Sequence, residues 1–84
     1  MTRRVIVEYA ARINDPKRHI RTRRHNDRFG KGLDVIWGVR RDGATEIQAL
    51  RFRKEYWTAR RAAAWLRRND FEPIGYGVVR KTVR

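Results

Sequence analysis

The sequence predicts an α+β protein in which an antiparallel sheet of about four strands is covered on one face by one helix. Three features support this fold class: an opening run of alternating apolar residues, a hairpin signal in the middle of the chain, and one apolar stripe at helical spacing near its end. With 84 residues and 40% hydrophobic content, residues 1–84 are expected to form one small domain.

The first expected strand covers residues 4–10, whose odd-numbered side chains would face the core. The basic segment that follows, residues 11–32, carries eight Lys and Arg against two Asp. Its Asp15-Pro16 pair is typical of a helix start. We therefore expect either a short helix over residues 16–24 or a mobile basic loop.

Residues 33–53 are predicted to form a hairpin, because Asp42-Gly43 lies between two strand-like runs. A two-residue turn there fixes which residues face each other, and a slip by one residue would exchange the two faces. The predicted pairs are Val39 with Glu46, Trp37 with Gln48, Val35 with Leu50, and Leu33 with Phe52. One face would carry Leu33, Val35, Trp37, Val39, Leu50 and Phe52, and the other Ile36, Arg40, Ile47, Arg51 and Arg53.

A helix is expected over residues 58–69, with Thr58 as its N-cap and Asn69-Asp70 at its end. Residues 74–84 are then expected to add the last strand of the sheet. The apolar stripe that would pack the helix on the sheet consists of Ala59, Ala62, Ala63 and Leu66, with Trp65 beside it.

Charge is the most extreme property of the chain. Twenty-two Lys and Arg against nine Asp and Glu give a formal net charge of +13. Because self-repulsion at this charge destabilises a compact domain, a polyanion is the expected partner. We expect nucleic acid, with DNA favoured over RNA, and an acidic protein surface as the alternative; an arginine-rich proteome would explain the charge without any partner. No segment approaches the ~18 apolar residues of a membrane span, so a cytoplasmic protein is expected.

The cations expected to hold nucleic acid lie in the basic segment and on the helix. A third group, the sheet group, is a further candidate and consists of Arg40, Arg51 and Arg53, to which Arg80, Lys81 and Arg84 can be added. The basic segment is preferred, because a dense and flexible stretch of cations suits wrapping around a backbone. No base-reading motif accompanies these residues, so phosphate contacts with little sequence specificity are expected. The predicted binding residues are Arg18, Arg21, Arg23, Arg24, Arg28, Lys31, Arg60, Arg61, Arg67 and Arg68.

Catalytic and metal-binding chemistry is nearly absent from the sequence. The chain has no Ser and no Cys, and no His or Cys cluster has structural-zinc spacing. His19, His25 and Asp27, which lie among arginines, could form a nuclease-like acid/base group; the alternative is two solvated histidines without a role. We expect no enzymatic activity, no cofactor and no metal.

The aromatic residues invite a base-stacking interpretation. The three tryptophans are expected in the core instead, because each falls on the inferred buried side. Phe29, inside the basic segment, is left open between the two roles.

Residues 47–76 (IQALRFRKEYWTARRAAAWLRRNDFEPIGY) resemble a segment of tailed-phage head and morphogenesis proteins, including prohead-protease-like proteins. The resemblance implies a phage or prophage origin and brings no catalytic residue with it. Its matching positions are Phe52, Lys54, Trp57, Thr58, Ala62, Trp65, Leu66 and Phe71.

The leading hypothesis is a small, non-catalytic, phage-type protein that binds the phosphate backbone of nucleic acid in the host cytoplasm. One alternative is a virion or assembly component that contacts packaged DNA or an acidic capsid surface. The other is an inhibitor that binds a host enzyme. The sequence gives no indication of oligomeric state.

Overall fold

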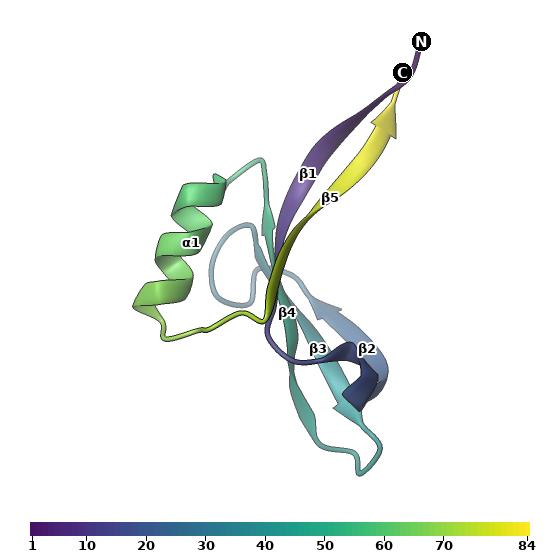
Figure 1. Ribbon diagram of the computed structural model, residues 1–84, viewed down its shortest axis with the longest axis vertical. Coiled ribbons are helices and arrows are strands. Elements are labelled where there is room, and N and C mark those ends of the chain that lie inside the picture. Colours follow the sequence, from purple (N-terminus) through teal and green to yellow (C-terminus); the bar gives the residue numbers. More distant parts are fainter.

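The computed structural model describes all 84 residues, which form one antiparallel five-stranded sheet and one helix (Figure 1). The predicted α+β class is confirmed. The strands follow the order β2-β3-β4-β1-β5 across the sheet. The elements are β1 (Arg3–Arg12), β2 (His19–His25), β3 (Leu33–Arg40), β4 (Thr45–Arg53), α1 (Ala59–Arg68) and β5 (Gly75–Val83).

The basic segment contains a strand. The two predictions made for it, a helix over residues 16–24 and a mobile loop, were both wrong. Pro16–Arg18 forms only a short 3₁₀ turn, whose N-cap Asp15 accepts a hydrogen bond from the backbone N–H of Lys17 at 2.9 Å. β2 follows at once and pairs with β3 at the edge of the sheet. Six of its seven residues are exposed, so the strand lacks the apolar alternation by which a half-buried strand is recognised.

The β3–β4 hairpin has the predicted register close to the core and a different one close to its turn. Leu33 faces Phe52 and Val35 faces Leu50, as predicted. Closer to the turn, Trp37 faces Ile47 rather than Gln48, so the observed register differs from the predicted one by one residue.

The shift arises at the turn, where the predicted two-residue turn is a three-residue loop. The N–H of Gly43 donates to the carbonyl of Arg40 at 2.9 Å, and the N–H of Arg40 donates to the carbonyl of Ala44 at 2.8 Å. Gly43 has φ +90°, a conformation that favours glycine in such loops. Val39 therefore faces Thr45 instead of Glu46, and a bulge at Gln48 restores the predicted register further along β4.

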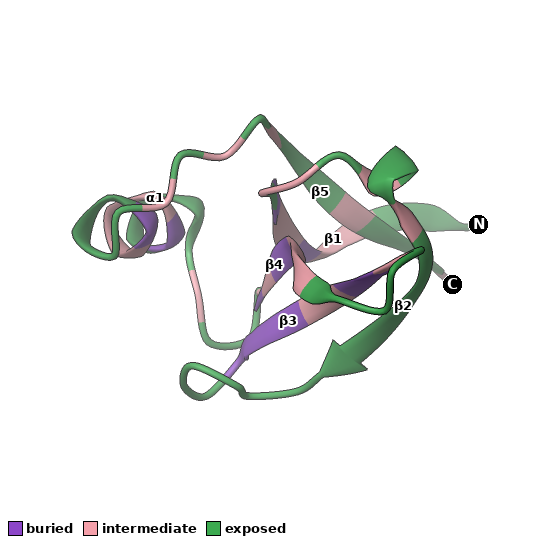
Figure 2. Cartoon of the chain, turned by 90° about the horizontal axis from the view of Figure 1, so that it is seen from below, coloured by how far each residue is buried: buried purple, intermediate pink, exposed green.

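The bulge also changes which face of the sheet Ile47 occupies. It was expected on the face with Arg51 and Arg53, but it packs against the core together with Trp37. The buried core lies between the sheet and α1, which covers one face (Figure 2). Its members are Ala11, Leu33, Val35, Leu50, Phe52, Ala62 and Leu66.

Helix α1 begins as predicted, because the Thr58 hydroxyl accepts a hydrogen bond from the backbone N–H of Arg61 at 3.1 Å. Ala62 and Leu66 form its fully buried face. All three tryptophans pack against the core, as expected. Trp65 stacks on Phe71 with ring centroids 5.7 Å apart. No helix of the structure has the length and apolarity needed to cross a membrane.

The outer parts of β1 and β5 extend beyond the rest of the sheet as a two-stranded arm, with both termini at its tip (Figure 1). In this arm Arg3–Ile6 pairs with Arg80–Val83, whereas β4 pairs with β1 only over Glu8–Arg12. The predicted burial of the odd-numbered side chains of residues 4–10 is therefore only partial, and full burial on that face is reached at Ala11.

Candidate nucleic-acid interface

Ion pairs divide the 22 Lys and Arg residues into two classes. Five arginines have a carboxylate partner, which leaves 17 cations without one. A cation that already has a carboxylate partner has less charge to offer a phosphate, so the other 17 are better suited to bind an anion. The five paired arginines are Arg18, Arg24, Arg40, Arg51 and Arg53.

Arg24 lies in an ionic network on the sheet face opposite α1. It donates to Glu8 at 2.6 Å and to Asp34 at 2.7 Å, and Arg51 donates to Glu8 at 2.9 Å. Burial raises the pKa of Glu8, but the hydrogen bonds from Arg24 and Arg51 outweigh it and hold that pKa below its ordinary value. The hydrogen bond to Glu8 in turn raises the pKa of Arg24. Arg24 thus serves the fold, although the sequence suggested a phosphate contact.

The loop over residues 26–32 is anchored at several points. Asp27 accepts a hydrogen bond from the N–H of Gly32 at 2.7 Å, and this bond lowers the pKa of Asp27. The indole of Trp57 donates to the carbonyl of Lys31 at 3.0 Å. Phe29, whose role the sequence left open, packs on Trp65 with ring centroids 5.9 Å apart. The cations of this loop are therefore held in a defined place beside α1.

His19 and His25 lie at opposite ends of β2, so the nuclease-like group that they might form with Asp27 is not assembled. The His19 side chain is 1% exposed, and its ring nitrogens lie 3.1 Å from Glu46 and 3.0 Å from Gln48. No three His, Cys, Asp or Glu side chains are grouped so that they could hold a metal.

Six exposed cations without a carboxylate partner lie on β2, on the loop after it and on the stripe of α1 that bears Trp65, and we call them the helix-side surface. β2 supplies two of them, because Arg21 and Arg23 face Val39 and Trp37 on the core side of the sheet. The loop that follows β2 supplies two more, and α1 supplies the last two on the side that bears Trp65. The helix-side surface consists of Arg21, Arg23, Arg28, Lys31, Arg61 and Arg68.

Aromatic rings position three of these cations without neutralising them. Arg28 lies over the ring of Phe29 at 5.0 Å, Lys31 over Tyr56 at 4.9 Å, and Arg61 over Trp57 at 4.8 Å. Arg61 also donates to the carbonyl of Tyr56 at 2.7 Å. Long flexible side chains are thereby held in place while their charge remains available.

The remaining predicted binding residues lie elsewhere. Arg60 and Arg67 share another exposed stripe of α1, two turns apart. Arg18 is paired with Glu46 at 3.1 Å, and Arg24 belongs to the network described above. The structure thus places six of the ten predicted residues on the α1 side of the sheet without an ion-pair partner, and it places Arg18 and Arg24 in ion pairs.

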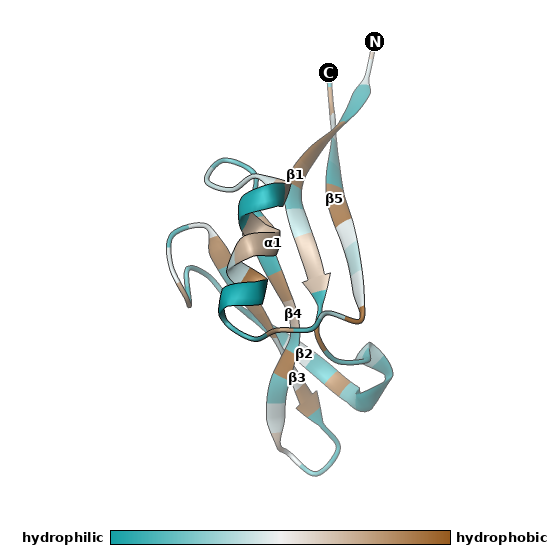
Figure 3. Ribbon diagram, turned by 60° about the vertical axis from the view of Figure 1, so that its left-hand side comes forward, coloured by the Kyte–Doolittle hydropathy of each residue, from teal (hydrophilic) through white to brown (hydrophobic).

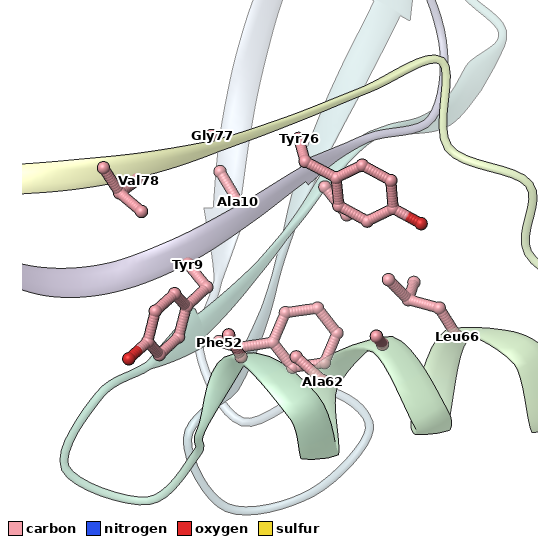
Figure 4. A pocket seen from close by; sticks show the side chains of 11 residues that line it. Tyr9, Ala10, Phe52, Ala62, Leu66, Tyr76, Gly77 and Val78 are labelled. Atoms are coloured by element: carbon pink, nitrogen blue, oxygen red, sulfur yellow. The ribbon is translucent and has the colours of Figure 1, made fainter.

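Two hollows accompany these surfaces. An apolar cleft of about 290 Å³ lies between α1 and the β1–β5 pair (Figure 4), where Tyr9, Phe52 and Val78 point into it. No charged side chain lines this cleft, so it has nothing to attract phosphate.

A wider hollow of about 570 Å³ lies on the opposite face of the sheet, beside the 3₁₀ turn. Three cations line it, but Asp15 lines it too and Arg51 is paired with Glu8. These carboxylates reduce its positive potential, and the hollow ranks below the helix-side surface as an anion site. Its cations are Arg12, Lys17 and Arg51.

The sequence placed three cations of the β1–β5 arm in the sheet group, but it did not join Arg3 and Arg4 to them. Arg3 and Arg4 lie near one end of the chain, and Arg80, Lys81 and Arg84 near the other. The antiparallel pairing of β1 with β5 brings the two groups together. Pairing of the first and last strands could have been guessed only from the topology of the whole sheet.

No protein-family model, no curated protein and no solved structure matches this chain.

Proposed function

We propose that the protein is a small, non-catalytic, phage-type nucleic-acid-binding protein that engages the phosphate backbone of DNA through the helix-side surface. One observation carries the proposal: none of the six exposed cations of the helix-side surface has an ion-pair partner. The loop over residues 26–32 and the segments that flank α1 also contain the carboxylates Asp27, Glu55, Asp70 and Glu72, and Asp27 is paired with Arg53. The excess of cations over carboxylates favours a positive potential, which is the electrostatic footprint of a nucleic-acid-binding protein.

The geometry of the aromatic rings favours phosphate contacts over base stacking. Phe29 and Tyr56 are each 37% exposed, but Arg28 lies over the ring of Phe29 and Lys31 over that of Tyr56. A base approaching either ring would have to displace a cation, whereas a phosphate can bind that cation directly. Contacts of this kind fix position on the backbone and carry little sequence information.

The proposal includes a place of action. A DNA-binding protein of phage type would work in the cytoplasm of the host cell, or in the virion on packaged DNA. Both settings use the same surface and the same phosphate chemistry.

The test is a fluorescence anisotropy titration of labelled duplex DNA at low salt. Arg21→Gln/Arg23→Gln removes two exposed cations of the helix-side surface, and we expect it to weaken binding at least several-fold. The matched control, Arg12→Gln/Arg41→Gln, removes the same charge from exposed residues that lie outside this surface and form no ion pair. The control should bind as the wild type does; equal losses in the two variants would show that net charge alone acts, without a defined surface.

A further inference from the structure

We propose that the β1–β5 arm is a second DNA contact, which enters the major groove of the duplex. The inference rests on the proposed function, because it presumes that DNA is the partner, but it concerns a different part of the molecule and makes a separate prediction. The arm consists of Arg3–Ile6 paired with Arg80–Val83, followed by the C-terminal Arg84.

All charged side chains of the arm are cationic. Five exposed cations lie on it, and none of them has a carboxylate partner. Residues 1–7 and 73–84 contain no Asp or Glu. Figure 3 shows hydrophilic and apolar stretches on both strands of the arm. The cations are Arg3, Arg4, Arg80, Lys81 and Arg84.

Cross-strand pairing places these charges on both faces of the ribbon. Arg3 is paired with Val83, and Val5 is paired with Lys81. Arg3 and Val5 are two residues apart on β1, so Arg3 and Lys81 lie on the same face of the ribbon. Arg4 and Arg80 share the other face by the same reasoning. A ribbon that is cationic on both faces suits a site that presents anions on both sides, and a groove of duplex DNA is flanked by two phosphate backbones.

The dimensions of the arm match the major groove. Paired strands lie about 4.8 Å apart, and four residues of strand span roughly 13 Å. The major groove of B-DNA is about 12 Å wide and about 8.5 Å deep, and it admits a two-stranded ribbon. The bulge at Val7 marks the point where the arm leaves the sheet, so no other strand flanks it beyond this point. The arm can therefore enter a groove without a clash from the rest of the sheet.

The same geometry distinguishes DNA from double-stranded RNA. The major groove of A-form RNA is deep and too narrow for side chains to read its base edges. An arm that uses the major groove should therefore prefer duplex DNA. Arginine and lysine in that groove meet O6 and N7 of guanine, which gives the arm a preference for guanine that the helix-side surface lacks.

Dimethyl sulfate footprinting tests the groove directly, because the reagent methylates N7 of guanine in the major groove and N3 of adenine in the minor groove. We expect the wild-type protein to protect guanine N7 and to leave adenine N3 reactive. Arg4→Gln/Arg80→Gln should lose most of the N7 protection and should still bind through the helix-side surface. The control Arg12→Gln/Arg41→Gln should retain the protection, and duplex RNA of the same sequence should compete at least several-fold less well than duplex DNA.

Each other result overturns the arm proposal in a recognisable way. Binding without N7 protection, protection of adenine N3, unchanged protection in Arg4→Gln/Arg80→Gln, or equal competition by duplex RNA would each exclude a major-groove arm while leaving DNA binding intact. Absence of any binding by the wild type would instead overturn the proposed function, and the arm proposal with it.

Discussion

Arg24 on β2 donates a hydrogen bond of 2.6 Å to Glu8 on β1, although β3 and β4 lie between these two strands in the sheet. In a flat sheet three strand spacings would separate their backbones by about 14 Å. The contact requires the sheet to curl toward the face opposite α1, as Figure 2 shows. Arg24 and Glu8 therefore link the edge strand β2 to β1 and hold the sheet in its curved shape.

Replacing Glu8 should weaken this curvature. Glu8→Gln leaves Arg24 and Arg51 without their shared carboxylate, and breaking a buried ion pair costs about 3–5 kcal/mol. Because Arg24 is partly exposed, we expect a loss of roughly 2–3 kcal/mol in the free energy of unfolding, measured by urea titration. Asp42→Asn, which removes an exposed pair with Arg40, should cost less than about 1 kcal/mol. Equal losses of unfolding free energy in the two variants would mean that the Glu8 contacts stabilise the protein no more than an exposed ion pair does.

Low pH should lower the stability of the folded protein through protonation of the same residue, Glu8. The pKa of Glu8 is lowered in the folded state, so its contribution to stability is present above its unfolded pKa of about 4.3 and is lost as the pH falls through the folded value. The difference in unfolding free energy between wild type and Glu8→Gln should therefore narrow below about pH 4.3. Urea titrations between pH 7 and pH 3 measure it; a difference that stays constant over this range would contradict the lowered pKa.

The buried His19 ring occupies the space in which Gly38 lacks a side chain. A methyl group at Gly38 would overlap the His19 ring. Gly38→Ala should therefore destabilise the protein by about 1–3 kcal/mol, as overpacking does. In the double mutant His19→Ala/Gly38→Ala the added cost of the alanine should largely disappear, and a double-mutant cycle measures this coupling. Additive effects would show that the two residues do not compete for the same space.

The role of Trp65 can be separated from that of the neighbouring arginines. Trp65 contacts Phe29, Phe52 and Phe71, so Trp65→Ala should lower the unfolding free energy by about 3 kcal/mol. Arg67→Gln/Arg68→Gln changes exposed residues and should stay within about 0.5 kcal/mol. A stable Trp65→Ala protein that has lost DNA binding would identify the indole as a stacking platform instead of a packing element.

The elements with strong local signals could be predicted from the sequence. Thr58 caps α1 as expected, and the inner pairs Leu33–Phe52 and Val35–Leu50 follow from the apolar alternation of β3 and β4. The outer register failed because the Asp42-Gly43 signal is compatible with loops of two or three residues, and the bulge at Gln48 leaves no mark in the alternation.

The candidate site was less predictable, because it depends on contacts between distant segments. The sequence carries no sign that Arg24 would meet Glu8, since the contact needs the curl of the sheet. β2 was missed because an exposed edge strand held by backbone hydrogen bonds needs no apolar face. The sequence singled out the charged loop and helix, but it does not show that their cations lie beside Tyr56 and Trp57, because this depends on the packing of Phe29 on Trp65 and on the hydrogen bond from Trp57 to Lys31.

The salt dependence of DNA binding tests the central proposal most directly. If the protein neutralises about four to six phosphates, the logarithm of the association constant should fall with the logarithm of salt concentration at a slope of about −4 to −5 on duplex DNA. In Arg21→Gln/Arg23→Gln the slope should be shallower by about 1.8, since two contacts are lost, and in Arg12→Gln/Arg41→Gln it should not change. A slope near zero for the wild type, or no binding at about 50 mM salt, would contradict phosphate binding by this protein.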